Sequence, residues 1–318
     1  VRSNELLNRR FLDYLLIYFK GMAMGAADVV PGVSGGTIAL IVGVYERLLR
    51  ALGSCTPDKL LWLARGRFGE TWRAIDGTFL VALIGGILTS IAAFANLLGY
   101  LLHTHGELTW SFFFGLILVS VYIVGREVRR WNLWTLLLTA LGAAFAYVIT
   151  VAAPMQWSSA PLFIFLAGSI AICAMILPGI SGSFVLVLLG LYATILGAVR
   201  SADLFTLAVF AAGCAAGLLS FARLVSWLLE HARSATMAVA TGLLIGSLNK
   251  VWPWKQTISW RENSKGVMEP MLQDNVMPAT YEALTGEPSW WIAGLLLMML
   301  AVVLVLTLEW IGQRISRG

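Results

Sequence analysis

Two long apolar stretches of this sequence are each interrupted by a Pro-Gly pair, and this feature constrains the fold more than any other. The interruptions lie in DVVPGVSGGTIALIVGVY (28–45) and in PGISGSFVLVLLGLY (178–192). Proline followed by glycine breaks a helix, because proline lacks an N–H donor and clashes with the preceding turn. Each stretch therefore predicts a helical hairpin, either re-entrant or made of two short crossings. At a rise of about 1.5 Å per residue, each limb would be a helix roughly 25 Å long.

The composition indicates a membrane protein. Of the 318 residues, 59% are hydrophobic and only 12% are charged, and the mean hydropathy is +0.82. A soluble domain carries about 25% charged residues, whereas a membrane-spanning helix needs about 20 consecutive apolar ones. We therefore expect an all-α polytopic membrane protein. Its apolar segments are 11–27, 34–50, 78–102, 109–125, 133–153, 161–176, 181–199, 204–229, 236–249 and 290–311.

The distribution of Lys and Arg predicts the side of the membrane on which each connection lies. With the N-terminus in the cytoplasm and two limbs counted for each hairpin, most basic residues fall in cytoplasmic segments, as the positive-inside rule requires. Counting either broken stretch as a single crossing inverts the sides partway along the chain and removes this bias. We therefore expect both termini in the cytoplasm. The outer segments hold only Arg200, Lys250, Lys255, Arg261 and Lys265.

The chain also contains an internal repeat. PGVSGGTIALIVGVY (31–45) aligns with 178–192, and SIAAFANLLGYLL (90–102) aligns with GLLSFARLVSWLL (217–229). An odd number of crossings separates the two hairpins, so the second half is expected upside down relative to the first. The prediction is one membrane domain, residues 1–318, built as an inverted repeat like many secondary transporters. The first repeat covers 11–153 with a basic cytoplasmic insert at about 52–77, and the second covers 161–311 with an outer loop at about 250–289.

The two broken segments predict a central anion site. Non-helical backbone is tolerated at membrane depth only where protein or a wet cavity satisfies it, and free N–H groups at helix N-termini bind phosphate. Glycine lets a headgroup approach the backbone closely. The alternative is that these glycines only allow tight helix packing. The predicted phosphate-binding residues are Ser34, Gly35, Gly36, Thr37, Ser181, Gly182 and Ser183, and the predicted hinges are Pro31, Gly32, Pro178 and Gly179.

Ionisable residues within apolar segments are costly, so they are functional candidates. Arg223 lies in the middle of 204–229 and is the predicted cation for the phosphate, since a guanidinium binds phosphate through two hydrogen bonds. Alternatively, Arg223 pairs with a carboxylate or reaches the inner interface. Asp28 would carry a coupling proton or cation, or else cap nearby backbone. Glu46 is a second candidate for ion coupling, with an interfacial ion pair beside Arg47 as the alternative.

Other polar clusters have simpler interpretations. His103 and His105 could bind a metal, but a solvated outer turn is the expected role, and the three scattered cysteines match neither a disulfide framework nor a metal site. We therefore expect no metal and no cofactor, apart from possible coupling to H⁺ or Na⁺. The Trp-rich outer loop 250–289 belongs to an aromatic belt or forms a lid over lipid headgroups.

The run GMAMGAADVVPGVSGGTIALIVGVYERLL (21–49), together with the second PGISGS, resembles the membrane family catalogued as domain of unknown function 368. The resemblance covers nearly the whole chain. It implies a polyprenyl-phosphate translocase, which returns undecaprenyl phosphate from the outer to the inner leaflet of the bacterial cytoplasmic membrane for cell-envelope synthesis. Such a protein would be a multi-pass lipid flippase working by alternating access, with a polyprenyl phosphate as its partner and no nucleic acid. The oligomeric state stays open.

Two other functions stay open at this point. Undecaprenyl-pyrophosphate phosphatases of the bacitracin-resistance type also have inverted repeats, but their motif resembles PGxSRSG, and Gly35 stands here at the arginine position. No ExxxE cluster precedes it, and the paired-histidine motifs of other lipid phosphatases are missing, so we expect no enzymatic activity. A small-anion or ion transporter is the second alternative.

Overall fold

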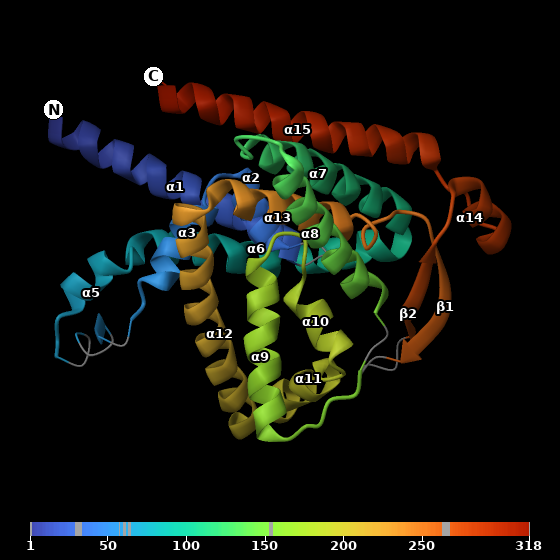
Figure 1. Cartoon of the computed structure of the whole chain (residues 1–318), viewed down its shortest axis with the longest axis horizontal. Helices are drawn as coiled ribbons and strands as arrows, with labels where there is room; N and C mark the ends of the chain where they lie inside the picture. The colour runs from blue at the N-terminus through green and yellow to red at the C-terminus, as the bar shows by residue number, and fades with distance from the viewer. Residues whose placement is uncertain are drawn as a thin grey trace.

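The computed structural model describes residues 2–28, 34–56, 58–59, 62, 65–152, 155–262 and 268–317, so the predicted hinge residues Pro31 and Gly32 lie outside it. Figure 1 shows a largely helical molecule. The first half contains α1 (Arg2–Asp28), α2 (Gly35–Ile41), α3 (Tyr45–Gly53), α5 (Phe68–Ala74), α6 (Gly77–Thr104), α7 (Gly106–Arg126) and α8 (Leu133–Val151). The second half contains α9 (Pro161–Ile176), α10 (Gly182–Leu188), α11 (Tyr192–Ser201), α12 (Leu204–His231), α13 (Arg233–Ser247), β1 (Lys255–Glu262), β2 (Met268–Asn275), α14 (Pro278–Thr285) and α15 (Trp291–Arg317).

Four pairs of helices form the framework, and glycine brings each pair close together. α1 packs along α6, α9 along α12, α7 along α15, and α8 along α13. A Cβ on Gly86 would lie 2.0 Å from a carbonyl oxygen of α1, and one on Gly242 would lie 2.1 Å from a carbonyl oxygen of α8. Gly213 and Gly115 make the same kind of approach to α9 and α15. Such contacts are typical of helices in lipid, where van der Waals packing drives association.

The second limb of each hairpin is bent, so the prediction of one straight helix per limb is wrong for 34–50 and 181–199. The breaks occur at Gly43 and Gly190, whose φ angles are +72° and +74°, and α10 and α11 meet at 108°. In both, the glycine N–H donates to the carbonyl three residues back, at 3.2 and 3.0 Å, and the next N–H donates five residues back, at 2.9 and 3.0 Å. This is the Schellman helix ending, and glycine adopts its left-handed conformation without strain.

A small sheet lies in the expected outer loop, so the all-α prediction missed one element. β1 and β2 form an antiparallel hairpin in which Lys255 lies opposite Asn275. Within the described residues, α6, α7, α8 and α12 are long and apolar enough to span a membrane, and the bent α10–α11 pair would make a fifth span. Large hydrophobic side chains on the outer faces of α8 and α15 are exposed, as lipid-facing residues are.

The first helix of each bent limb, α2 or α10, packs against a hydrophobic core, whereas much of α11 is exposed. In Figure 1, α1 and α15 run across one end, while α9 and α12 run side by side away from them, with α10 and α11 nearby. The larger core contains buried residues of α2, α3, α6, α7 and α13, including Ile38, Leu49 and Ile117. A second core surrounds α10 and contains Leu186 and Leu191. The second Pro-Gly segment and the start of α2 are therefore placed next to packed interior rather than on the surface.

Candidate functional site

The N-terminus of α2 is capped by two side chains. The Ser34 hydroxyl accepts a hydrogen bond from the Gly36 N–H at 3.1 Å, and the Asp28 carboxylate accepts one from the Gly35 N–H at 2.7 Å. A helix N-terminus favours negative charge, because its first N–H groups lack helical partners and the helix dipole is positive there. Asp28 therefore occupies a position at which an external anion would otherwise bind.

The start of α2, which follows the first Pro-Gly motif, contacts the second Pro-Gly segment and the end of α9 directly. The Thr37 hydroxyl of α2 accepts a hydrogen bond from the Gly179 N–H at 2.8 Å. The hydroxyl groups of Ser34 and Tyr45 donate to the last carbonyls of α9, those of Met175 and Ile176, each at 3.2 Å. Thus the N-terminal end of α2 faces the C-terminal end of α9, with opposite ends of two helix dipoles brought together.

The glycines of the motifs are in tight contact with backbone or carboxylate atoms. A Cβ on Gly36 would lie 2.9 Å from the Ile176 carbonyl oxygen, and one on Gly182 would lie 2.6 Å from that of Ala171. A Cβ on Gly35 would lie 2.4 Å from an Asp28 carboxylate oxygen. In this conformation, close packing accounts for all three glycines: Gly36 meets the other hairpin, whereas Gly35 and Gly182 meet atoms of their own hairpins.

The second motif differs from the first in how its helix begins. Ser181 and Ser183 bond to each other through their hydroxyls at 2.9 Å, and no side chain caps α10. Position 175, which corresponds to Asp28 in the repeat, is a methionine. Gly179 has a φ of +84°, and its Cα faces the Ser247 hydroxyl at the end of α13. The second helix start thus lacks the internal carboxylate that the first one has.

Arg223 lies apart from these contacts. Its guanidinium donates from Nε to the Gly53 carbonyl at 3.0 Å and from Nη2 to the Cys55 carbonyl at 2.9 Å. It therefore caps the C-terminal end of α3, where a cation is favoured by the helix dipole. The side chain is exposed, and its role towards a phosphate stays a prediction.

Glu46 belongs to an ion-pair cluster that joins three helices. Arg233 at the start of α13 donates to Glu46 of α3 at 2.6 Å and to Glu127, after α7, at 2.8 Å. Arg47 instead pairs with Asp76 at 2.7 Å. Glu46 and Arg47 both form ion pairs, but with partners distant in sequence, which local spacing could not identify.

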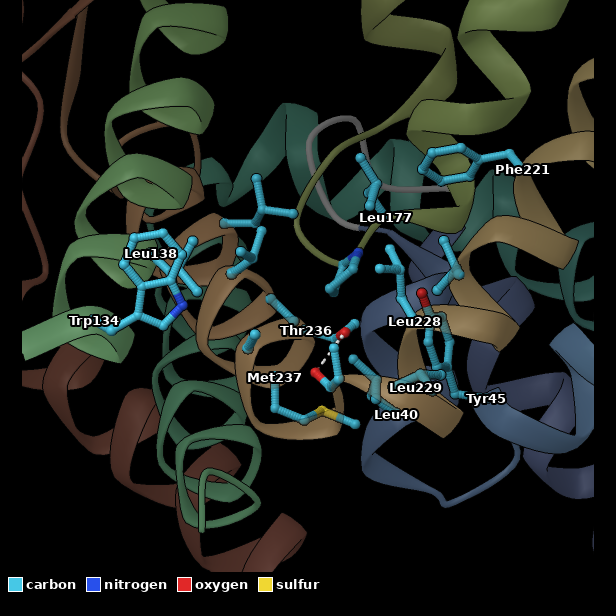
Figure 2. A pocket seen from close by; sticks show the side chains of 17 residues that line it. Leu40, Tyr45, Trp134, Leu138, Leu177, Phe221, Leu228, Leu229, Thr236 and Met237 are labelled. Carbon is cyan, nitrogen blue, oxygen red and sulfur yellow. Dashed lines mark hydrogen bonds between the residues drawn. The ribbon is translucent and has the colours of Figure 1, made fainter. Parts of the chain in front are cut away.

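An apolar cavity of about 330 Å³ opens beside the second Pro-Gly segment. Figure 2 shows Leu177 above it, Trp134 and Leu138 of α8 on one side, and Tyr45 and Leu229 on the other. This volume is at the lower end of the range of ligand pockets, about 300–1,000 Å³. The nearly complete absence of polar lining suits a hydrocarbon chain better than a headgroup.

Two lysines that no sequence motif indicated as site residues also lie beside the second motif. The Lys250 ammonium lies 4.4 Å from the ring centroid of Phe184, the third residue of α10, and the Lys255 ammonium lies 4.6 Å from that of Trp110. Both side chains are partly buried. A signal for them was available in the sequence, because only five Lys or Arg residues fall in the predicted outer segments and four of these lie in the Trp-rich loop 250–289.

The histidines and cysteines make no metal site in the part of the chain that the structure describes. No group of three His, Cys, Asp or Glu residues there could hold a metal ion. His105 sits at the turn before α7, and the His103 side chain lies outside the described residues. Cys55, Cys173 and Cys214 are free thiols.

Comparisons with known proteins find a matching family and related transporters. The sequence profile of the VCA0040-like family, described as undecaprenyl phosphate translocase-like, matches residues 24–269. A polyprenyl-phosphate transporter of Vibrio cholerae is 52% identical over 299 residues, covering 94% of this chain and 97% of the relative. A polyprenyl-phosphate transporter of Staphylococcus aureus is 34% identical over 252 residues, covering 74% and 84%. No solved structure matches. The resemblance inferred from the first motif is thereby confirmed.

Proposed function

Because the chain belongs to the undecaprenyl phosphate translocase-like family, we propose that it moves undecaprenyl phosphate from the outer to the inner leaflet of the bacterial cytoplasmic membrane. The lipid would be returned for reuse in cell-envelope synthesis. The observation that carries the proposal is 52% identity to a polyprenyl-phosphate transporter over almost the whole of both chains. The protein acts as a carrier and not as an enzyme.

The proposed mechanism is alternating access between two inverted repeats. Support comes from the pairing of helices, because α1 with α6 in the first half corresponds to α9 with α12 in the second. In the other two pairs, each helix packs against a helix of the opposite half. α7 of the first half packs with α15, and in the corresponding way α13 of the second half packs with α8. The two halves also share a local feature, the Schellman helix endings at Gly43 and Gly190. Rocking of one half against the other would open the segment contact first to one side and then to the other.

The phosphate would pass between the two Pro-Gly segments when they separate. Separation breaks the Thr37–Gly179 hydrogen bond and frees the hydroxyls of Ser34 and Thr37, which are each only 1% exposed here. Those donors, with Ser181, Ser183 and the N–H groups of Gly35, Gly36 and Gly182, would then face the headgroup. Arg223 would attract the phosphate on the cytoplasmic side during release.

Asp28 would couple this movement to a proton or a cation. As a carboxylate it accepts from the Gly35 N–H and repels a phosphate from the same place. Neutralising Asp28 by a bound H⁺, or screening it with Na⁺, removes that repulsion and makes room for the headgroup. Glu46 is the second coupling candidate, and its ion pair with Arg233 would have to open for it to exchange an ion.

The polyprenyl tail would lie partly in the apolar cavity. The cavity begins at Leu177 and Pro178 of the second segment and runs between α8 and α12. Its volume of about 330 Å³ accommodates only part of a long isoprenoid chain, so the remainder would stay in the lipid. This division lets the protein shield the headgroup while the tail follows through the bilayer.

Binding measured by native mass spectrometry in nanodiscs tests the proposal. We expect retention of undecaprenyl phosphate in preference to undecaprenol and to phosphatidylglycerol, with a loss in the Ser34→Ala/Ser181→Ala double variant and in Arg223→Gln. Arg130→Gln, an exposed arginine on the turn after α7, serves as the control. Equal retention of all three lipids would contradict the proposal. Displacement of the lipid by a short soluble phosphate at equal concentration would favour a small-anion transporter instead.

A further inference from the structure

Lys250 and Lys255 form a pair of cations held together by the backbone and by aromatic rings. The Lys255 ammonium donates a hydrogen bond to the carbonyl of Lys250. Each ammonium lies over a ring, Phe184 of α10 for Lys250 and Trp110 of α7 for Lys255. These cation–π contacts fix the direction of two otherwise flexible side chains. Through Trp110 the pair contacts α7, which belongs to the first half of the chain. Through Phe184 it contacts α10, which follows the second Pro-Gly motif.

This cation pair has no counter-charge in the part of the chain that the structure describes. Neither lysine forms an ion pair there. Of the carboxylates on the surrounding elements, Glu107 of α7 accepts from the Tyr281 hydroxyl, and Asp274 of β2 is exposed. Burial lowers the pKa of Lys250, and burial together with the Lys250 charge lowers the pKa of Lys255 to about 7. Partly buried like charges are costly unless an anion joins them.

The position of the pair connects it to the second motif. Phe184 occupies the repeat position of Thr37, the residue that joins the two Pro-Gly segments. Lys250 follows the end of α13, where Ser247 packs against Gly179. The lysine pair therefore lies on the face of the molecule that borders the start of α10. This helix start is uncapped and lacks the carboxylate found at α2. In the proposed topology this face is on the outer side of the membrane.

We propose that Lys250 and Lys255 together bind a phosphate monoester at the outer face of the second motif, before it enters between the Pro-Gly segments. This inference rests on the proposed function for the identity of the lipid, but the cation pair defines the chemistry by itself. A phosphate monoester carries about −1.5 to −2 charges at pH 7 and three acceptor oxygens. A bound phosphate favours the protonated form of Lys255. Two ammonium groups then match the phosphate charge, whereas a carboxylate or a sulfate ester would carry only one negative charge.

The test compares lipid retention in Lys250→Gln, Lys255→Gln and their double variant, in nanodiscs, by native mass spectrometry. Loss of a hydrogen bond to a charged group predicts roughly tenfold weaker retention of undecaprenyl phosphate for each single variant. Lys59→Gln, a cytoplasmic-insert lysine that donates to the Ala74 carbonyl, should retain the lipid as the wild type does. Lys250→Arg/Lys255→Arg should restore most of the binding. Thermal unfolding of each variant checks that the fold is intact.

The outcomes separate this inference from the proposed function. If the wild type retains undecaprenyl phosphate and the folded double glutamine variant retains it equally, the cation-pair site is refuted while the carrier function stands. If the wild type shows no preference for the lipid phosphate, the proposed function fails. In that case, a titration with inorganic phosphate tests the lysine pair alone. If the wild type binds inorganic phosphate and the double variant does not, the pair is a site for free phosphate. If the wild type binds no inorganic phosphate, the proposed site at the pair is refuted.

Discussion

The hydrogen bond between Thr37 and Gly179 joins the two hairpins, so its removal should change how often they separate. The Thr37 side chain is 1% exposed, and its hydroxyl lies 2.8 Å from the Gly179 nitrogen. Thr37→Val keeps the shape of the side chain but leaves a buried N–H without an acceptor, which costs about 1–3 kcal/mol. Separation lets the N–H regain water, so the free energy of opening should fall by this amount. The open population would rise roughly 5- to 150-fold.

Hydrogen exchange followed by mass spectrometry in nanodiscs measures this opening. In Thr37→Val, we expect the amides of 176–190 to exchange roughly 5 to 150 times faster, while exchange along the interface of α8 and α13 stays unchanged. Thr37→Ser retains the hydroxyl acceptor and should behave nearly as the wild type does. Unchanged exchange in the valine variant, or an equal acceleration in the serine variant, would refute the reasoning that this bond holds the hairpins together.

Three further predictions concern packing, charge and coupling. Gly86→Ala should destabilise the protein by about 1–3 kcal/mol through overpacking against α1. Gly99→Ala on the same helix, where a Cβ would meet no atom of another described element within 4 Å, should leave the melting temperature unchanged or higher. Equal effects of the two substitutions would contradict the helix pairing. Because the pKa of Lys255 is lowered to about 7, the side chain loses its charge as the pH rises. Affinity for the lipid phosphate should therefore fall by about tenfold between pH 7 and pH 9. Lys255→Arg should remove most of that fall, and an affinity that does not change with pH in the wild type would contradict this role of Lys255. Asp28→Asn cannot exchange a proton, so reconstituted transport that depends on pH in the wild type should be independent of pH in the variant; an unaltered profile would remove Asp28 from coupling.

The sequence predicted the helices well, because most of them are long apolar segments with clear ends. It did not predict the bends at Gly43 and Gly190, although both glycines align in the repeat. A glycine inside an apolar run is equally compatible with close helix packing and with a left-handed helix ending. Only the surrounding structure decides between them. The hairpin of β1 and β2 was missed for a related reason, because its polar and aromatic residues also suit an interfacial loop.

The candidate site was harder to predict, because its contacts join residues far apart in the chain. The motif residues were identified by their repeat, but the sequence did not reveal that Asp28 caps Gly35 or that Thr37 reaches Gly179. The sequence indicated Arg223 as an embedded charge, and in the structure it binds carbonyls at the C-terminal end of α3. The lysine pair escaped notice because its two aromatic partners come from α7 and α10, which no spacing rule connects.

Lipid movement across a reconstituted bilayer tests the central claim most directly. Undecaprenyl phosphate is incorporated into both leaflets of sealed proteoliposomes, and an external phosphatase that cannot cross the bilayer removes the accessible phosphate. Our account predicts that hydrolysis proceeds beyond the outer-leaflet share to near completion with the wild type, and stops at that share in protein-free vesicles. Hydrolysis that stops at the outer-leaflet share with folded wild-type protein, under every pH and sodium gradient applied, would contradict the account.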